Sequence, residues 1–165
     1  MANFTCASSA EEDGTHSQQS NAWPNYESDY RPLIEFAKRA DIPVIAANAP
    51  RKIVRCVGLK GVSYLDKLDS KQRVFVAATI NTDDSQYKDK FMASMHHGKP
   101  EQTEKQYAAQ MTWDETMAMN VAKYLNANPD TDAVLTLGPT SADPTLLALN
   151  ENGMAGDIYF GTFDL

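Results

Sequence analysis

Apolar residues along the chain follow two kinds of pattern, stretches with helical spacing and short continuous runs. Helical spacing predicts helices at residues 28–40, 51–57, 84–97, 101–126 and 144–151. Short apolar runs predict strands at residues 42–47, 73–80, 133–137 and 158–161. The run from Ile42 to Ala47 is nearly continuous, which is typical of a strand buried on both faces of a parallel sheet.

This alternation of helices and strands predicts an α/β fold, a layered and mostly parallel sheet flanked by helices. Residues 1–22 are rich in Ser, Gln, Asn and Glu and predict a flexible polar tail. The remaining residues, 23–165, then form a single α/β domain. Ligands of such sheets bind beyond the carboxyl ends of the strands, which here lead into the loops 48–51 and 138–141.

Composition narrows the class of protein. The chain has 165 residues, of which 42% are hydrophobic and 22% charged, so we expect a soluble globular protein. Its formal charge of −7 disfavours nucleic acid as a partner. We find neither a transmembrane run nor a signal peptide. The two cysteines, Cys6 and Cys56, predict neither a disulfide framework nor a zinc site. Nothing in the composition indicates an oligomeric state.

The loop that follows the first predicted strand carries two candidate binding residues. Asn48 can turn its amide into a crevice, and Arg51 offers a guanidinium that suits a carboxylate or phosphate. A plain strand-to-helix turn with a surface arginine explains the same residues, and residue types alone favour that interpretation.

The longest predicted helix places an amide and a carboxylate inside an apolar stripe. Gln110, Asp114 and Met117 share a helical face, with Tyr107 one turn before them. Buried polar groups need partners, so Gln110 and Asp114 either line a pocket or bond to nearby backbone. We expect Asp114 to be at least partly buried and within hydrogen-bonding reach of the loop at Asn48, directly or through Gln110.

His96 and His97 end a predicted helix beside Met92 and Met95. Imidazole and thioether groups can ligate haem iron or copper, but histidines also cap helix C-termini, which is the commoner role. The chain lacks the spacing of a hydrolase nucleophile elbow, a phosphate loop, a zinc-protease helix and a dinucleotide fingerprint. We therefore expect no enzymatic activity, and a metal site is not indicated.

Three segments resemble the ChaN-like family, haem-binding uptake proteins of the Tiki superfamily. They are residues 23–57 (WPNYESDYRPLIEFAKRADIPVIAANAPRKIVRCV), 83–97 (DDSQYKDKFMASMHH) and 107–125 (YAAQMTWDETMAMNVAKYL). The resemblance implies haem binding in iron uptake, and a periplasmic or membrane-anchored lipoprotein. A Gly-x-x-His element of that family is replaced by Gly138-Pro139-Thr140-Ser141.

Residues 126–165 resemble part of a periplasmic sugar-binding protein of an ABC importer. Together the two resemblances imply two family fragments joined near residues 120–130, as a natural fusion, a designed chimera or a fragment. The second resemblance also implies a sugar site in which Asp143 and Asp164 accept hydrogen bonds and Phe163 stacks on the sugar.

The leading hypothesis is a haem-binding protein. Arg51 would pair with a propionate, Gln110 and Asp114 would shape the pocket beside Asn48, and the axial ligand would come from Tyr107, His96 or His97. The alternatives are a small-sugar-binding module and an α/β scaffold without a ligand. A metalloprotease activity, as in distant Tiki relatives, is the weakest interpretation because paired Gly-x-x-His elements are absent.

Overall fold

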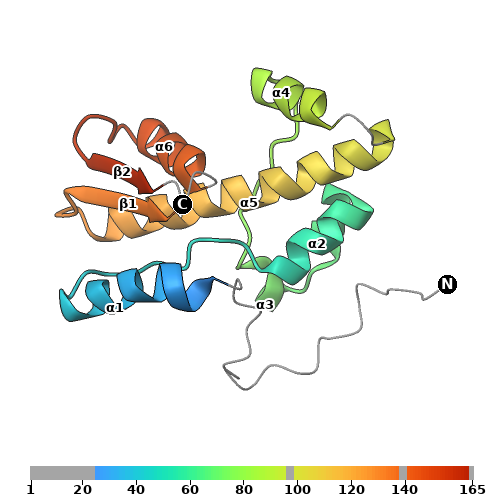
Figure 1. Cartoon of the computed structure of the whole chain (residues 1–165). Helices are drawn as coiled ribbons and strands as arrows, with labels where there is room; N and C mark the ends of the chain where they lie inside the picture. Colours follow the sequence, from blue (N-terminus) through green and yellow to red (C-terminus); the bar gives the residue numbers. More distant parts are fainter. Residues whose placement is uncertain (1–24, 96–98, 138–140, 164–165) are drawn as a thin grey trace. The chain divides into compact units, whose positions relative to one another are not determined.

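The computed structural model describes residues 25–95, 99–137 and 141–163 of the chain. Its contacts divide the chain into two compact units, Met1–Ala46 and Ala47–Leu165. The elements, labelled in Figure 1, are η1 (Tyr26–Tyr30), α1 (Arg31–Arg39), α2 (Arg51–Lys60), η2 (Val62–Lys67), α3 (Ser70–Arg73), α4 (Gln86–Ser94), α5 (Pro100–Ala127), β1 (Ala133–Leu137), α6 (Ala142–Glu151) and β2 (Tyr159–Phe163).

The described part of the first unit is mainly one helix. The π-helical turn η1 leads into α1, and Pro32 lies in the first turn of α1, where a missing N–H costs nothing. This confirms the helix predicted over residues 28–40. The strand predicted at residues 42–47 is wrong: the segment is not part of a sheet, and Ile42 and Val44 are 51% and 56% exposed. An apolar run indicates a buried strand only where a neighbouring strand accepts its backbone hydrogen bonds.

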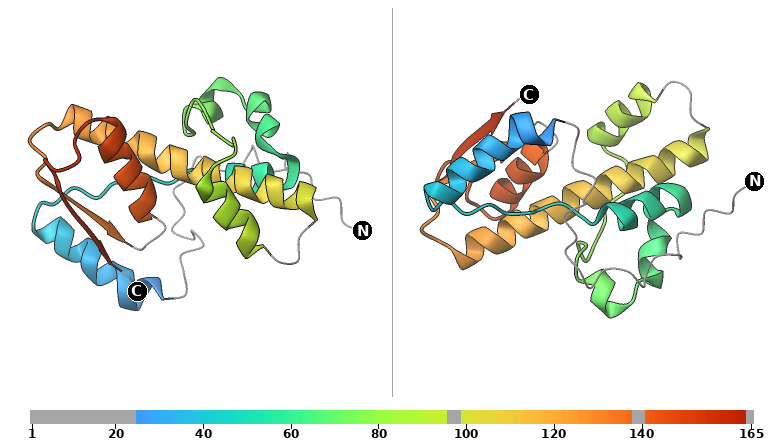
Figure 2. Two further views of the ribbon diagram at one scale, coloured as in Figure 1. Left: turned by 90° about the horizontal axis from the view of Figure 1, so that it is seen from above. Right: turned by 60° about the horizontal axis from the view of Figure 1, so that its bottom comes forward.

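The second unit is built along α5. Pro100 occupies the first turn of this helix, which continues to Ala127 and ends at Asn128. The views in Figure 2 show α2 and α4 along its N-terminal half, and α6 with the two strands along its C-terminal half. Because neighbours cover more than one side, buried residues lie around α5 instead of in a single stripe.

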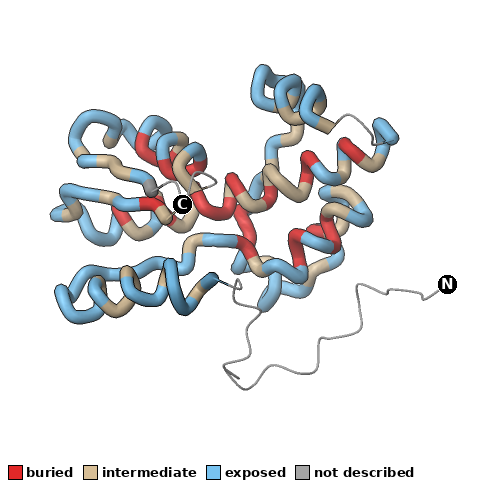
Figure 3. The backbone as a smooth tube through the Cα atoms, in the orientation of Figure 1, coloured by how far each residue is buried: buried red, intermediate tan, exposed pale blue. Residues whose placement is uncertain are grey.

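Two apolar clusters hold these neighbours to α5, and the buried segments stand out in Figure 3. Near the N-terminal half, Ile53 and Val57 of α2 pack with Leu65, Val76 and Ala108. Near the C-terminal half, the buried residues are Ala118, Val121, Leu125, Ala148 and Leu149. The helix α2 ends at Gly61, whose φ of 86° is readily adopted by glycine.

The strands β1 and β2 pair in parallel, in a register from Ala133 opposite Tyr159 to Leu137 opposite Phe163. The helix α6 connects them, so this region is one β-α-β unit. The strands predicted at residues 133–137 and 158–161 are confirmed, and so is the mixed α/β class. The predicted layered sheet is not confirmed, because the described residues form only this two-stranded sheet.

The strand predicted at residues 73–80 is also wrong. Asp69 caps the short helix α3, and Arg73 at its end donates hydrogen bonds to the carbonyls of Val76, Ala77 and Ala78 at 2.8, 2.6 and 2.7 Å. The Ala77 N–H donates to the hydroxyl of Thr116 at 3.2 Å. Side chains therefore supply partners that a neighbouring strand would have supplied, and the segment folds as a turn followed by an irregular stretch.

Candidate functional site

A pocket of about 390 Å³ lies in the second unit, beside α5. The segment before α4, α4 itself, α5 and α6 all contribute to it. Its apolar and aromatic lining consists of Tyr87, Tyr107, Met111, Pro144 and Leu147. Its acidic lining consists of Asp83, Asp84, Asp114, Glu115, Asp143 and Glu151. None of the described residues that line it is Lys, Arg or His.

A hydrogen-bonded group from α4 and α5 forms part of this wall. The hydroxyl of Tyr87 donates to Oδ2 of Asp114 at 3.0 Å. The amide of Gln110 donates to both carboxylate oxygens of Asp114, at 3.0 and 3.1 Å. Only 7% of Asp114 is exposed, so these donors replace the water that the carboxylate loses on folding.

Burial and like charges change the acidity of three groups in the pocket. Burial raises the pKa of Asp114, partly opposed by the hydrogen bonds from Gln110 and Tyr87, and the charge of Asp143 adds to the increase. Burial also raises the pKa of Glu115, to which the charge of Glu151 contributes. The pKa of the Tyr87 phenol is raised by burial and by the neighbouring Asp114.

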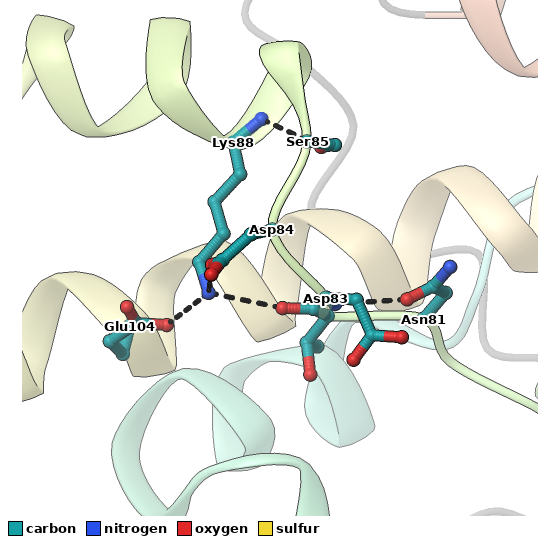
Figure 4. Close-up of polar contacts among 7 residues, drawn as sticks. Asn81, Asp83, Asp84, Ser85, Lys88 and Glu104 are labelled. Atoms are coloured by element: carbon teal, nitrogen blue, oxygen red, sulfur yellow. Dashed lines mark hydrogen bonds and ion pairs between the residues drawn. The ribbon is translucent and has the colours of Figure 1, made fainter.

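A lysine beside the pocket is held among oxygen atoms (Figure 4). Nζ of Lys88 lies 3.3 Å from Oδ1 of Asp84, 3.1 Å from Oε2 of Glu104 and 3.1 Å from the carbonyl oxygen of Thr82. It also lies 5.5 Å from the centroid of the Tyr107 ring. The side chain is only 12% exposed, and its hydrogen bond to Glu104 is the main reason that its pKa is raised. An ammonium group is therefore bound here by carboxylates and an aromatic face together.

Three of the candidate haem-binding residues come together in this region. Tyr107 and Asp114 line the pocket, and Gln110 is bonded to Asp114. The prediction that Asp114 is buried is confirmed. Tyr87 was not among the residues predicted from the sequence, although it lies on the helix predicted over residues 84–97. A hydroxyl-bearing aromatic residue on that helix was the available signal.

Asn48 and Arg51 are not among the residues that line the pocket. Both are exposed, and Oδ1 of Asn48 accepts a hydrogen bond from the Ala49 N–H at 2.8 Å. The predicted contact between Asp114 and this loop is wrong: Asp114 bonds to Tyr87 and Gln110, and among the described residues no hydrogen bond joins Asp114 or Gln110 to the loop. The loop is instead tied to α5 by Asn120, whose amide donates to the carbonyl of Ala47 at 2.8 Å.

Several predicted residues lie outside the described part of the chain. They are His96, His97, Gly138, Pro139, Thr140 and Asp164. Within the described part, no group of three or more His, Cys, Asp and Glu residues is placed to hold a metal ion. No helix there is long and apolar enough to cross a membrane.

The pocket fits one part of a haem and not another. Tyrosine rings, Met111 and Leu147 suit an apolar macrocycle. The propionates of haem are carboxylates, and an acidic lining without a cationic side chain repels them. A complete haem with both propionates inside this pocket does not fit these residues.

Comparison with known protein families gives a match over most of the chain. The sequence model of the family described as "Haem-binding uptake, Tiki superfamily, ChaN" matches residues 5–140, which is more than half of the chain. The match starts before Trp23 and continues past the junction hypothesised near residues 120–130, and no comparison supports a sugar-binding segment. Comparisons with curated proteins and with solved structures gave no significant match.

Proposed function

Because the chain belongs to the ChaN family of haem-binding uptake proteins in the Tiki superfamily, we propose that it binds haem. The observation that carries this proposal is the family match over residues 5–140, which includes every candidate haem-binding residue named from the sequence: Asn48, Arg51, His96, His97, Tyr107, Gln110 and Asp114.

The structure supports different parts of this proposal with different residues. The aromatic and apolar wall of Tyr107, Met111 and Leu147 would contact the macrocycle, and the hydrogen-bonded pair Gln110–Asp114 would shape the pocket beside it. Arg51 would pair with a propionate, because it is exposed at the start of α2 and is not part of the acidic lining. His96, His97 and Tyr107 are the residues proposed to bind the haem iron, and Asn48 would donate a hydrogen bond. When bound, haem would supply the iron chemistry of the family.

Titration of the full chain with ferric haemin, followed by the Soret band, tests this proposal. We expect a shifted Soret band that saturates at one equivalent. Arg51→Ala should weaken binding about tenfold through loss of a charge-assisted contact, whereas Lys52→Ala, an equally charged and exposed neighbour, should not. A spectrum identical to that of free haemin would refute the proposal.

A further inference from the structure

The pocket beside α5 has a charge that the family's ligand does not explain. Of the six carboxylates in its lining, Asp83, Asp84, Asp143 and Glu151 are exposed at its edge. Asp84 pairs with Lys88, whereas Asp143 and Glu151 form no ion pair within the described part of the chain. Negative charge is therefore concentrated around an opening with aromatic and apolar walls.

We propose that this pocket binds a small organic cation with a flat apolar body, a ligand class opposite in charge to the propionates of haem. The apolar wall of Tyr87, Tyr107 and Leu147 would contact the body of the ligand. The carboxylates of Asp143 and Glu151 would attract its positive charge. This inference goes beyond the proposed haem binding and does not depend on it.

Lys88 gives an independent indication of the chemistry. Its ammonium lies beside the pocket, 5.5 Å from the Tyr107 ring centroid and within ion-pairing distance of Asp84 and Glu104. The chain thus already stabilises one organic ammonium with the ring of Tyr107 and the carboxylates of Asp84 and Glu104, and Figure 4 shows the two carboxylates beside Lys88. The Tyr87 ring, whose centroid lies 6.2 Å from that of Tyr107, offers the same kind of surface to a ligand.

The volume of the pocket and the placement of its carboxylates favour an organic cation over a metal ion. A volume of about 390 Å³ lies within the roughly 300–1,000 Å³ of small-molecule pockets. A bare metal ion would need several ligand atoms around one point, and no such group occurs within the described part of the chain. An organic cation needs only an apolar surface and nearby negative charge, and the pocket supplies both.

The buried Asp114 and the partly buried Glu115 support this assignment. Burial and the neighbouring charges of Asp143 and Glu151 raise the pKa values of Asp114 and Glu115, respectively. A cation in the pocket would offset this repulsion and favour the charged carboxylates, so its binding should release protons.

The test is a fluorescence titration of the full chain with N-methylacridinium, a flat cation, and with acridine-9-carboxylate, a flat anion. We expect the cation to bind at least tenfold more tightly, with an affinity that falls as salt is added. Asp143→Asn combined with Glu151→Gln should weaken cation binding about tenfold. The control, Asp66→Asn combined with Asp157→Asn, changes the net charge equally at exposed positions outside the lining, and should have little effect.

Equal affinity for both probes would overturn the inference. Equal weakening of cation binding in the lining variant and in the control would also overturn it, because it would indicate attraction by net charge alone. Thermal unfolding of each variant shows whether it is folded. Haemin titration in parallel separates the two proposals, since loss of haemin binding with retained cation binding contradicts only the proposed function.

Discussion

The hydroxyl of Tyr87 donates to Oδ2 of Asp114 across 3.0 Å and links α4 to α5 through the wall of the pocket. The two helices also meet through aromatic contacts, with ring centroids of Phe91 and Tyr107 5.4 Å apart. Because Gln110 also donates to Asp114, the carboxylate is fixed by side chains from both helices. The position of α4 should therefore depend on this small polar group.

Removing the Tyr87 hydroxyl should destabilise the second unit. Tyr87→Phe keeps the ring and leaves Asp114 with Gln110 as its donor, so we expect a loss of about 1 kcal/mol in the free energy of unfolding. Urea denaturation followed by circular dichroism measures it. Tyr159→Phe is the matched control, since Tyr159 is 82% exposed. Equal stability of Tyr87→Phe and wild type would show that the hydrogen bond contributes nothing.

Asp114→Ala should be more damaging than Tyr87→Phe. It removes the acceptor for Tyr87 and Gln110 together, and we expect a cost of about 1–3 kcal/mol in the free energy of unfolding. Asp114→Asn keeps the side-chain shape and one oxygen acceptor, so it should cost less. Asp114→Ala would instead be less damaging than Tyr87→Phe if the repulsion between Asp114 and Asp143 outweighed these hydrogen bonds.

Two buried threonines on α5 form a matched pair for a second test. Both are 0% exposed, and each hydroxyl donates to the carbonyl four residues earlier. Only Thr116 also accepts a hydrogen bond from outside the helix, from the Ala77 N–H. Thr116→Val should therefore leave a buried donor unpaired and cost about 1–3 kcal/mol, whereas Thr112→Val should cost less than about 1 kcal/mol.

Hydrogen exchange gives a direct check of that difference. The Ala77 amide should exchange faster in Thr116→Val and at the wild-type rate in Thr112→Val. Equal protection in both variants would mean that the contact with Thr116 does not hold the segment that follows α3.

The turn clamped by Arg73 should depend on a guanidinium and not merely on a positive charge. Its NH1 group donates to Val76 and Ala77, and its NH2 group to Ala78. Lysine cannot reproduce this forked geometry, so Arg73→Lys should lower the free energy of unfolding by about 1 kcal/mol. Lys71→Arg, an exposed change on the same short helix, serves as the control in urea denaturation. No difference between the two variants would contradict a specific role for the clamp.

These contacts also explain what the sequence could and could not predict. Helical spacing identified α5 and α6 because each of these helices buries a set of residues that the spacing reveals. It also identified α1, although none of the residues of α1 is buried. The apolar runs at residues 42–47 and 73–80 resemble the run that forms β1. A strand, however, forms only where a neighbouring strand pairs with its backbone, and the run itself does not reveal whether such a neighbour exists. At 73–80, Arg73 and Thr116 supply the hydrogen bonds instead.

The candidate site was predictable to a similar degree. The stripe of Tyr107, Gln110 and Asp114 followed from spacing on a single helix. Tyr87, by contrast, belongs to α4, and two acidic residues at the edge of the pocket, Asp143 and Glu151, belong to α6. Contacts between residues far apart in the chain depend on how the helices pack, which no local pattern contains. The same reason explains why the contact predicted between Asp114 and the Asn48 loop was wrong.

The raised pKa of Asp114 predicts how stability changes with pH. Its folded-state pKa lies above the ordinary value of 3.8, so the folded chain binds this proton more tightly than the unfolded chain. The contribution of Asp114 to stability should therefore increase as the pH falls through the raised pKa, and be least favourable at neutral pH. Asp114→Asn carries no titrating group at this position. Hence wild type should gain stability relative to this variant as the pH falls from about pH 7 to pH 4.

Urea denaturation across this range measures the difference, and Thr112→Val, which changes no charge, should show a difference from wild type that does not vary with pH. A difference between wild type and Asp114→Asn that moves in the opposite direction would mean that the donors Tyr87 and Gln110 outweigh burial and lower the pKa of this carboxyl.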